Sequence, residues 1–129
     1  MLIQKTVQNL IPRIFAIRHE TEFNELALEV FKLHLAHNPV YGRFVHYLKP
    51  GMKPEDIRHF SQIPFLPIDF FKTQKVLLEG CKEQDYFMSS GTTSQGAVQS
   101  RHYIVDMDLY ERCFLTAFRM FWGEPEEYV

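Results

Sequence analysis

Ser89-Ser90-Gly91-Thr92-Thr93-Ser94-Gln95-Gly96 is the stretch of this 129-residue chain that decides how the rest is interpreted. Five of its eight residues carry a hydroxyl group and two are glycine. Short runs typical of strands stand on both sides, at 85–88 and from Arg101 to Val105. Glycine lets a backbone approach a ligand closely, and successive N–H groups with hydroxyls form a concavity suited to anionic oxygens. The composition therefore indicates a phosphate-binding loop between two strands.

Two other interpretations of this loop must be weighed. Ser, Thr and Gly are ordinary turn residues, so a polar hairpin connection without further function also explains the composition. Gly91 and Gly96 have the glycine spacing of the P-loop of nucleoside triphosphatases, but Ala97 and Val98 follow them. A P-loop needs Lys and then Ser or Thr at those positions to hold phosphates and magnesium. The P-loop is therefore excluded, and the ordinary turn remains open.

The overall composition indicates a globular protein of one domain. Hydrophobic residues make up 46% of the chain and charged residues 23%, which is typical of a packed core. The net charge of −2 gives no general attraction to nucleic acid or to an anionic membrane. No apolar run approaches the roughly 20 residues that span a bilayer. Cys81 and Cys113 lie outside C-x-x-C spacing and are interpreted as reduced thiols, so we expect a cytoplasmic protein.

Two helices are expected in the first part of the chain. An apolar stripe at 3–17 predicts a helix that Pro12 bends or divides. A second amphipathic helix is expected to begin with Thr21 as its N-cap and to run to about His37.

Proline marks the starts of the next two elements. Asn38-Pro39 has the pattern of an N-cap followed by proline at the first helical position. A further short helix is expected near Pro54, with Ile57 and Phe60 facing inward. Together with the first two helices, these elements predict a helical region over residues 1–62.

The segment Ile63–Lys72 combines two prolines with bulky apolar residues, so it is neither a regular helix nor a central strand. We expect it to lie extended across a hydrophobic surface and to turn helical at Asp69. Val76–Leu78 is a candidate strand. The segment 63–72 therefore separates the helical region from a β-loop-β-helix unit at 73–129.

The last helix has the clearest pattern. Asp108 and Glu111 have the spacing of a capping box, and Gly123 and Pro125 provide the stop. A broad apolar face follows helical spacing, and it consists of Leu109, Cys113, Phe114, Ala117, Phe118, Phe121 and Trp122. So much aromatic surface, beside strands with unpaired edges, predicts the front part of a larger α/β protein, in which the start of a mixed sheet follows N-terminal helices. The exposed strand edges also make self-association an expectation.

Ser89-Ser90-Gly91-Thr92-Thr93, between two strands and ahead of a helix, resembles the phosphate-binding signature of adenylate-forming enzymes such as acyl-CoA synthetases and phenylacetate-CoA ligases. Three further runs are similar to the N-terminal part of the acyl-protein synthetase (LuxE-like) family: Asn38-Pro39-Val40-Tyr41, Ile63–Ile68 with Phe70-Phe71-Lys72, and Ser100-Arg101-His102. The resemblance covers the whole chain, which corresponds to about the first third of a family member.

This resemblance implies an ATP-dependent acid–thiol ligase that activates a carboxylic acid, in the first place a fatty acid, as an acyl-adenylate. The acyl group then passes to a thiol of an acceptor protein or of coenzyme A. Ser89, Ser90, Gly91, Thr92, Thr93 and Ser94 would bind the β- and γ-phosphates of ATP, with Mg²⁺ as the second cofactor. The resemblance also implies that this chain alone is inactive, since the other motifs of the family lie downstream.

The chain departs from the family signature at several positions. Ser94 stands where Gly is usual, and Gly96-Ala97 replaces a common Pro-Lys pair, which removes one phosphate contact. Arg101 is a candidate substitute cation. The alternative is a binding or interaction module that keeps the fold without the chemistry.

Two other kinds of site have weaker patterns. His34 and His37 are three residues apart on a helix, with His46 further along, but no carboxylate or cysteine completes a metal-ligand set. A triad of Ser90, His102 and Asp106 lacks the G-x-S-x-G elbow. Cys113 is expected on the core face of its helix, so it is not assigned as the acyl acceptor.

Overall fold

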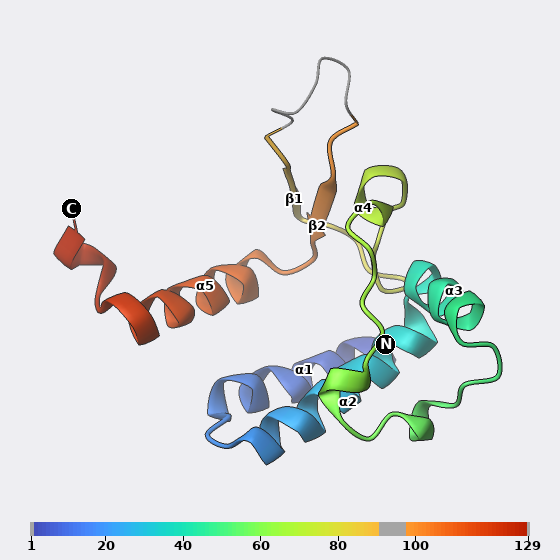
Figure 1. Ribbon diagram of the computed structural model, residues 1–129. Helices are drawn as coiled ribbons and strands as arrows, with labels where there is room; N and C mark the ends of the chain where they lie inside the picture. The colour runs from blue at the N-terminus through green and yellow to red at the C-terminus, as the bar shows by residue number, and fades with distance from the viewer. Residues whose placement is uncertain (1, 91–97, 129) are drawn as a thin grey trace. The chain divides into compact units, whose positions relative to one another are not determined.

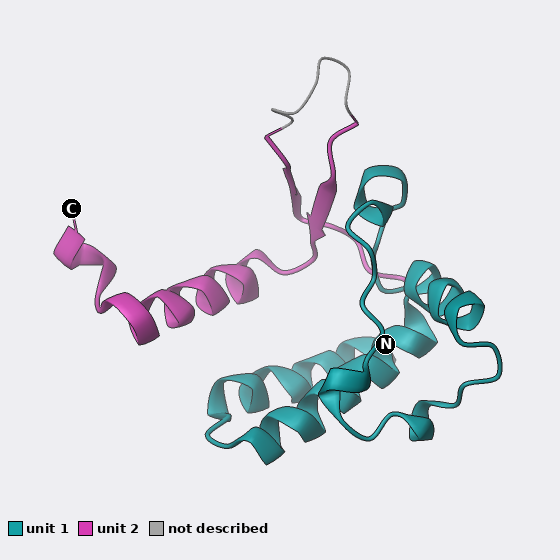
Figure 2. Cartoon of the chain, in the orientation of Figure 1, with its two compact units in different colours: residues 1–79 teal, residues 80–129 magenta. Residues whose placement is uncertain are grey.

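The computed structural model describes residues 2–90 and 98–128. The chain divides into two compact units, residues 1–79 and residues 80–129 (Figure 2). The first unit contains helices, and the second contains an antiparallel strand pair and one long helix (Figure 1). The expectation of mixed helix and sheet is confirmed. In the described residues the sheet has two antiparallel strands.

Helix α1 (Leu2–Ala16) runs unbroken through Pro12, so of the two expected outcomes, a bend or a division, the division is wrong. A proline inside a helix removes one backbone hydrogen bond, and only one turn of α1 follows Pro12. Leu10 is buried. The Arg13 guanidinium donates two hydrogen bonds of 2.6 Å to the Glu29 carboxylate, and this pair joins α1 to the next helix. That bond to Arg13 holds the pKa of Glu29 below its usual value.

Helix α2 (Glu20–His37) begins earlier than expected, with His19 and not Thr21 at the N-cap. The reason is Glu22, whose carboxylate accepts from the backbone N–H groups of Arg18 and His19 at 2.7 and 3.2 Å. These bonds satisfy donors that the first turn leaves open, and they lower the pKa of Glu22. The capping carboxylate therefore sets the start of the helix.

Helix α3 (Pro39–Leu48) follows directly, and its expected start is confirmed. Asn38 is buried and its Oδ1 accepts from the backbone N–H of Tyr41 at 3.2 Å, with Pro39 at the first helical position. Helices α2 and α3 come close at Gly42, where an added Cβ would lie 2.9 Å from the Leu35 carbonyl oxygen. A residue with a side chain does not fit at position 42 unless the helices move apart.

Two 3₁₀ turns, η1 (Pro54–Asp56) and η2 (Phe60–Gln62), take the place of the short helix expected near Pro54. The inward position of Ile57 is confirmed, because it is buried. The Phe60 ring is half-buried and meets the Phe23 ring edge-on, with 5.0 Å between centroids. A buried cluster of Phe31, Tyr41, Val45 and Ile57 forms the core of this unit.

The segment after Gln62 is extended and crosses this core as expected, with Ile63 and Leu66 packed against the buried cluster. It then forms the single helical turn α4 (Phe70–Thr73), which follows Asp69. The strand expected at Val76–Leu78 is wrong, because these residues form no strand. A backbone hydrogen bond from the Glu79 N–H to the His37 carbonyl, at 2.7 Å, joins the end of this stretch to α2.

In the second unit, β1 (Asp85–Met88) pairs antiparallel with β2 (Arg101–Ile104), and Tyr86 lies opposite Tyr103. Helix α5 (Met107–Trp122) follows. Its N-cap is Asp106, whose carboxylate accepts from the Leu109 N–H at 2.9 Å, so the expected capping role of Asp108 is wrong. The stop is confirmed: Gly123 adopts a φ of 84° and the turn η3 (Pro125–Tyr128) begins two residues later.

Helix α5 buries none of its residues. Phe114, Phe121 and Trp122 are 50%, 79% and 63% exposed, and Cys113 is exposed too, which corrects the expectation that it lies on a buried face. Ring contacts join α5 to its neighbours near both of its ends. Near its start the Tyr110 ring stacks on Phe87 at 5.1 Å between centroids, and near its end Phe118 meets Tyr128. No described helix is both long enough and apolar enough to cross a membrane.

Candidate functional site

The expected phosphate loop connects β1 to β2. Of its six expected ligand-binding residues, Ser89 and Ser90 belong to the described part of the chain. Gly91, Thr92, Thr93 and Ser94 lie outside the described residues. The structure therefore describes the base of the loop.

Two serines hold the base of the loop together. The Ser89 N–H donates to the carbonyl of Ser100 at 3.1 Å, and the Ser89 hydroxyl accepts from the Ser100 N–H at 3.2 Å. Ser100 is buried, at 5% exposure, although most of this unit is open to solvent. These two hydrogen bonds thus fix the point at which the strand pair ends and the loop begins. The Ser89 hydroxyl oxygen accepts from the Ser100 N–H, so the hydroxyl hydrogen of Ser89 is the atom that can donate to another group.

Arg101 stands at the exit of the loop, where the sequence suggested a substitute cation. Its guanidinium carbon lies 5.8 Å from the centroid of the Tyr86 ring, on the neighbouring strand. A guanidinium at this distance from an aromatic face is attracted by the ring quadrupole. Arg101 is exposed, so its charge is available to an anion near the base of the loop.

The other two residues of the candidate triad, His102 and Asp106, belong to different local structures. In the antiparallel register His102 lies opposite Phe87, and the Asp106 carboxylate caps α5. Asp106 therefore already has a structural role. Among the described residues, no group of three or more His, Cys, Asp or Glu side chains gathers at metal-ligand distances.

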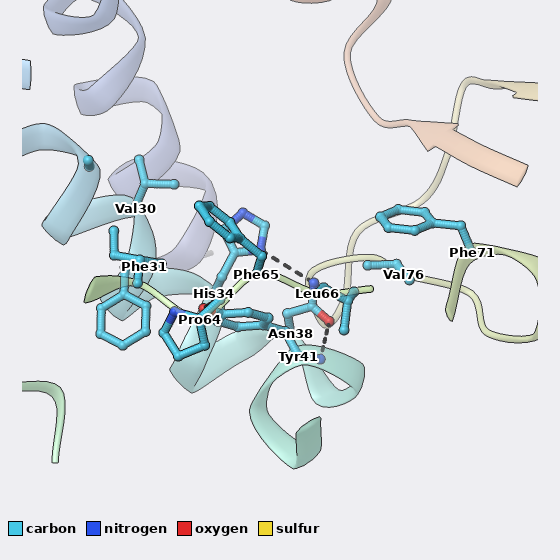
Figure 3. A pocket seen from close by; sticks show the side chains of 12 residues that line it. Val30, Phe31, His34, Asn38, Tyr41, Pro64, Phe65, Leu66, Phe71 and Val76 are labelled. Atoms are coloured by element: carbon cyan, nitrogen blue, oxygen red, sulfur yellow. Dashed lines mark hydrogen bonds between the residues drawn. The ribbon is translucent and has the colours of Figure 1, made fainter. Parts of the chain in front are cut away.

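His34 belongs to a hydrogen-bonded group that sequence reasoning did not anticipate. Its Nδ1 lies 3.3 Å from Nδ2 of Asn38, and Asn38 also caps α3 (Figure 3). The Tyr41 hydroxyl donates to the Pro64 carbonyl at 2.7 Å. Burial lowers the pKa of His34 and raises the pKa of Tyr41 to about 12. Both side chains are therefore neutral at pH 7.

These residues line a pocket of about 410 Å³ in the first unit. Helix α2 and the start of α3 form one side, and the extended segment after Gln62 forms the other (Figure 3). Apart from His34 and Asn38 the lining is apolar or aromatic, and it includes Phe65, whose ring is 82% exposed. The sequence indicated Asn38-Pro39 as a cap, His34 as a weak metal-ligand candidate and Ile63–Lys72 as an extended segment, but none of these patterns indicated a cavity.

Comparison with known proteins does not add a relative to these observations. No protein-family model, no curated protein and no solved structure matches the chain.

Proposed function

We propose that this chain supplies the phosphate-binding loop of an ATP-dependent acid–thiol ligase of the cytoplasm, an acyl-protein synthetase-like enzyme. The supporting observation is the setting of the sequence Ser89-Ser90-Gly91-Thr92-Thr93. It starts where β1 ends, and the Ser89–Ser100 hydrogen bonds hold its base closed. Because the strand pair already holds the two ends of this hydroxyl-rich stretch together, an anion that binds it need not supply the cost of closing the loop.

In the proposed reaction a carboxylate oxygen of the acid attacks the α-phosphorus of ATP. The bond between that phosphorus and the bridging oxygen breaks, so that pyrophosphate leaves and an acyl-adenylate remains. A thiol then attacks the acyl carbon, AMP leaves, and the thiol proton passes to solvent. The demanding part of the first step is the negative charge on the leaving pyrophosphate, and preorganised donors reduce its cost.

The residues of this chain would act on that leaving group. The hydroxyls of Ser89, Ser90, Thr92 and Thr93 would donate to oxygens of the β- and γ-phosphates, together with backbone N–H groups of the loop. Arg101 would add a positive charge beside its base. Mg²⁺, when bound with ATP, would neutralise phosphate charge.

The direct test is carboxylate-dependent exchange of pyrophosphate into ATP. It compares this chain with a C-terminally extended protein, using fatty acids from short to long. We expect exchange with the extended protein alone. Exchange by neither protein would reject the ligase and leave the loop as an ordinary turn.

Replacing one hydroxyl tests the loop itself. In the extended protein, Thr92→Ala is expected to weaken ATP binding by about 10- to 150-fold, which corresponds to the roughly 1.5–3 kcal/mol of a hydrogen bond to a charged group. Titration calorimetry measures this effect. The matched control is Thr21→Ala, which removes an exposed threonine of α2 and should leave the affinity unchanged. Equal ATP affinities of wild type and Thr92→Ala would contradict the assignment.

The second candidate is a non-catalytic interaction module, and the exposed aromatic surface of the second unit favours it. Tyr86 and Phe87 on β1 and the C-terminal turn of α5 leave large apolar side chains in solvent. Each strand of the pair also has one edge without a β partner among the described residues. Sedimentation velocity over a range of concentrations tests self-association. Self-association without pyrophosphate exchange by either protein would favour the module.

A further inference from the structure

The apolar pocket of the first unit contains one hydrogen-bond donor whose position is held by its neighbours. Oδ1 of Asn38 is occupied as the acceptor for the Tyr41 N–H, so the amide nitrogen is the atom that faces His34. An amide nitrogen donates and does not accept. Nδ1 of His34 must therefore be the acceptor, and the proton of the neutral ring is on Nε2.

This Nε2–H has no protein partner in the described part of the chain, where Asn38 is the one hydrogen-bond partner of the His34 side chain. No fully buried side-chain nitrogen or oxygen in that part lacks a partner. Nε2 must therefore be reachable from solvent, and His34 lines the pocket. The ring thus carries a neutral donor of fixed tautomer that solvent can reach, on a residue of the pocket lining.

The rest of the lining determines the charge that an occupant can carry. None of the lining side chains is Asp, Glu, Lys or Arg. An ionised group placed here would lose its hydration without gaining a counter-charge, which is strongly unfavourable. An uncharged acceptor such as a carbonyl oxygen would accept from Nε2–H and leave its apolar remainder against Val30, Phe31 and Leu66.

The pocket also has the size and the construction of a small-molecule site. Its volume of about 410 Å³ lies within the range of roughly 300–1,000 Å³ that such sites occupy, and such sites pair an apolar lining with a few placed polar groups. The hydrogen bond from Tyr41 to the Pro64 carbonyl holds one wall to α3. The exposed ring of Phe65 belongs to the lining, and a bound molecule would cover part of it.

We propose that this pocket binds an uncharged aliphatic molecule that carries one carbonyl group, with the carbonyl oxygen accepting from Nε2–H of His34. The site is formed by residues 27–76 and does not depend on the proposed phosphate loop. Its test therefore needs no ATP, and the two proposals can fail separately.

The experiment uses the 129-residue chain at pH 7.5 and a pair of eight-carbon probes, 2-octanone and octanoate. Binding is followed by saturation-transfer NMR and by the ¹H–¹⁵N correlations of the histidine rings. We expect 2-octanone to bind and to shift the Nε2 resonance of His34. Octanoate should bind at least about tenfold more weakly, since its charge would be buried without a partner.

Four variants separate the effect of the donor from the effect of the cavity. His34→Leu should weaken 2-octanone binding by about 2- to 10-fold, the loss of one neutral hydrogen bond. His34→Gln keeps a donor and should stay within about threefold of wild type. Val30→Trp should fill the pocket and abolish binding, whereas Val105→Trp, a partly exposed valine of the second unit, should not. Thermal unfolding verifies that each variant is folded.

Three results would overturn the proposal. They are no binding of 2-octanone to the wild-type chain, octanoate binding as tightly as the ketone, and ketone affinity that is unchanged in His34→Leu. The shift of the His34 resonance is measured on the wild-type chain, so the proposal remains testable even if a variant does not fold.

Discussion

Helices α2 and α5 have 18 and 16 residues and both are amphipathic, yet they differ in what covers their apolar faces. Helix α2 buries Leu26 and Phe31, because α1, α3 and the segment after Gln62 pack around it. Helix α5 buries nothing. All seven buried hydrophobic residues of the described chain belong to residues 1–79.

This difference shows what an amphipathic pattern specifies. The pattern of apolar residues is a local property, and both helices form in the stretches where it predicts them, although each begins at another cap than the expected one. Burial of the apolar face requires a second layer, and most helix stability in proteins comes from such packing. We therefore expect residues 1–79 to resist unfolding more strongly than residues 80–129. Five predictions test this contrast.

The largest effect is expected from removing one aromatic ring in each unit. Phe31→Ala should cost about 3–5 kcal/mol, because Phe31 is in the core and leaves a cavity. Phe121→Ala, at a position 79% exposed, should change stability by less than about 0.5 kcal/mol. Urea unfolding followed by circular dichroism measures both. Equal costs would mean that α5 is packed in solution and that the contrast is wrong.

Tyr41→Phe tests the hydrogen bond that holds the extended segment. Loss of the 2.7 Å bond leaves the Pro64 carbonyl without its donor, which costs about 1–3 kcal/mol at a buried position. Hydrogen exchange should then increase first in the segment after Gln62. An unchanged exchange pattern would show that this segment is held by apolar contacts alone.

The same residue gives a pH dependence. The folded pKa of Tyr41, about 12, lies above its ordinary value of 10.0. The unfolded state therefore loses the phenol proton first, so the stability contributed by neutral Tyr41 is complete below about pH 10. It should decline as the pH rises from 10 to 12. Tyr41→Phe should remove this part of the alkaline loss, as measured by unfolding at several pH values.

Gly42→Ala tests how closely α2 and α3 approach. Alanine normally stabilises a helix relative to glycine by about 0.5–1 kcal/mol. Here the new Cβ would lie 2.9 Å from the Leu35 carbonyl oxygen, so overpacking should reverse the sign and cost about 1–2 kcal/mol in total. A stabilised variant, in the same urea experiment, would mean that the helices can separate freely.

The smallest effect concerns the cap of α5. Asp106→Ala removes the carboxylate that accepts from the Leu109 N–H and should lower stability of this helix by about 1 kcal/mol. Asp108→Ala removes a first-turn charge and should cost only about 0.3–1 kcal/mol. Helix content by circular dichroism compares the two variants. A larger loss for Asp108→Ala would restore the capping assignment made from sequence.

Local signals predicted much of the fold but placed several boundaries wrongly. Asn38-Pro39 and Gly123 specify one end of a helix each, because their effect depends only on the adjacent backbone. Thr21 and Asp108 have suitable side chains for caps, but Glu22 and Asp106 make the observed cap bonds. Each stretch contains several residues whose side chains can cap a helix. The path of the chain before the helix decides which of them makes the cap bond.

The candidate sites also combine features that follow from the sequence with features that follow from the tertiary structure. The amino-acid sequence by itself determined the hydroxyl-rich stretch Ser89–Ser94, the strands beside it and the apolar faces of the helices, since these depend on residue type and spacing. Only the tertiary structure decided that Ser89 and Ser100 close the base of the loop and that His34 is held by Asn38 beside an apolar pocket. It also decided that α2 is covered and α5 exposed. The Ser89–Ser100 contact joins residues eleven apart in sequence. His34 and Asn38 are four residues apart, but the pocket beside them also needs the segment after Gln62, and the cover over a helix depends on which neighbouring layer is present. No local pattern encodes these longer-range arrangements.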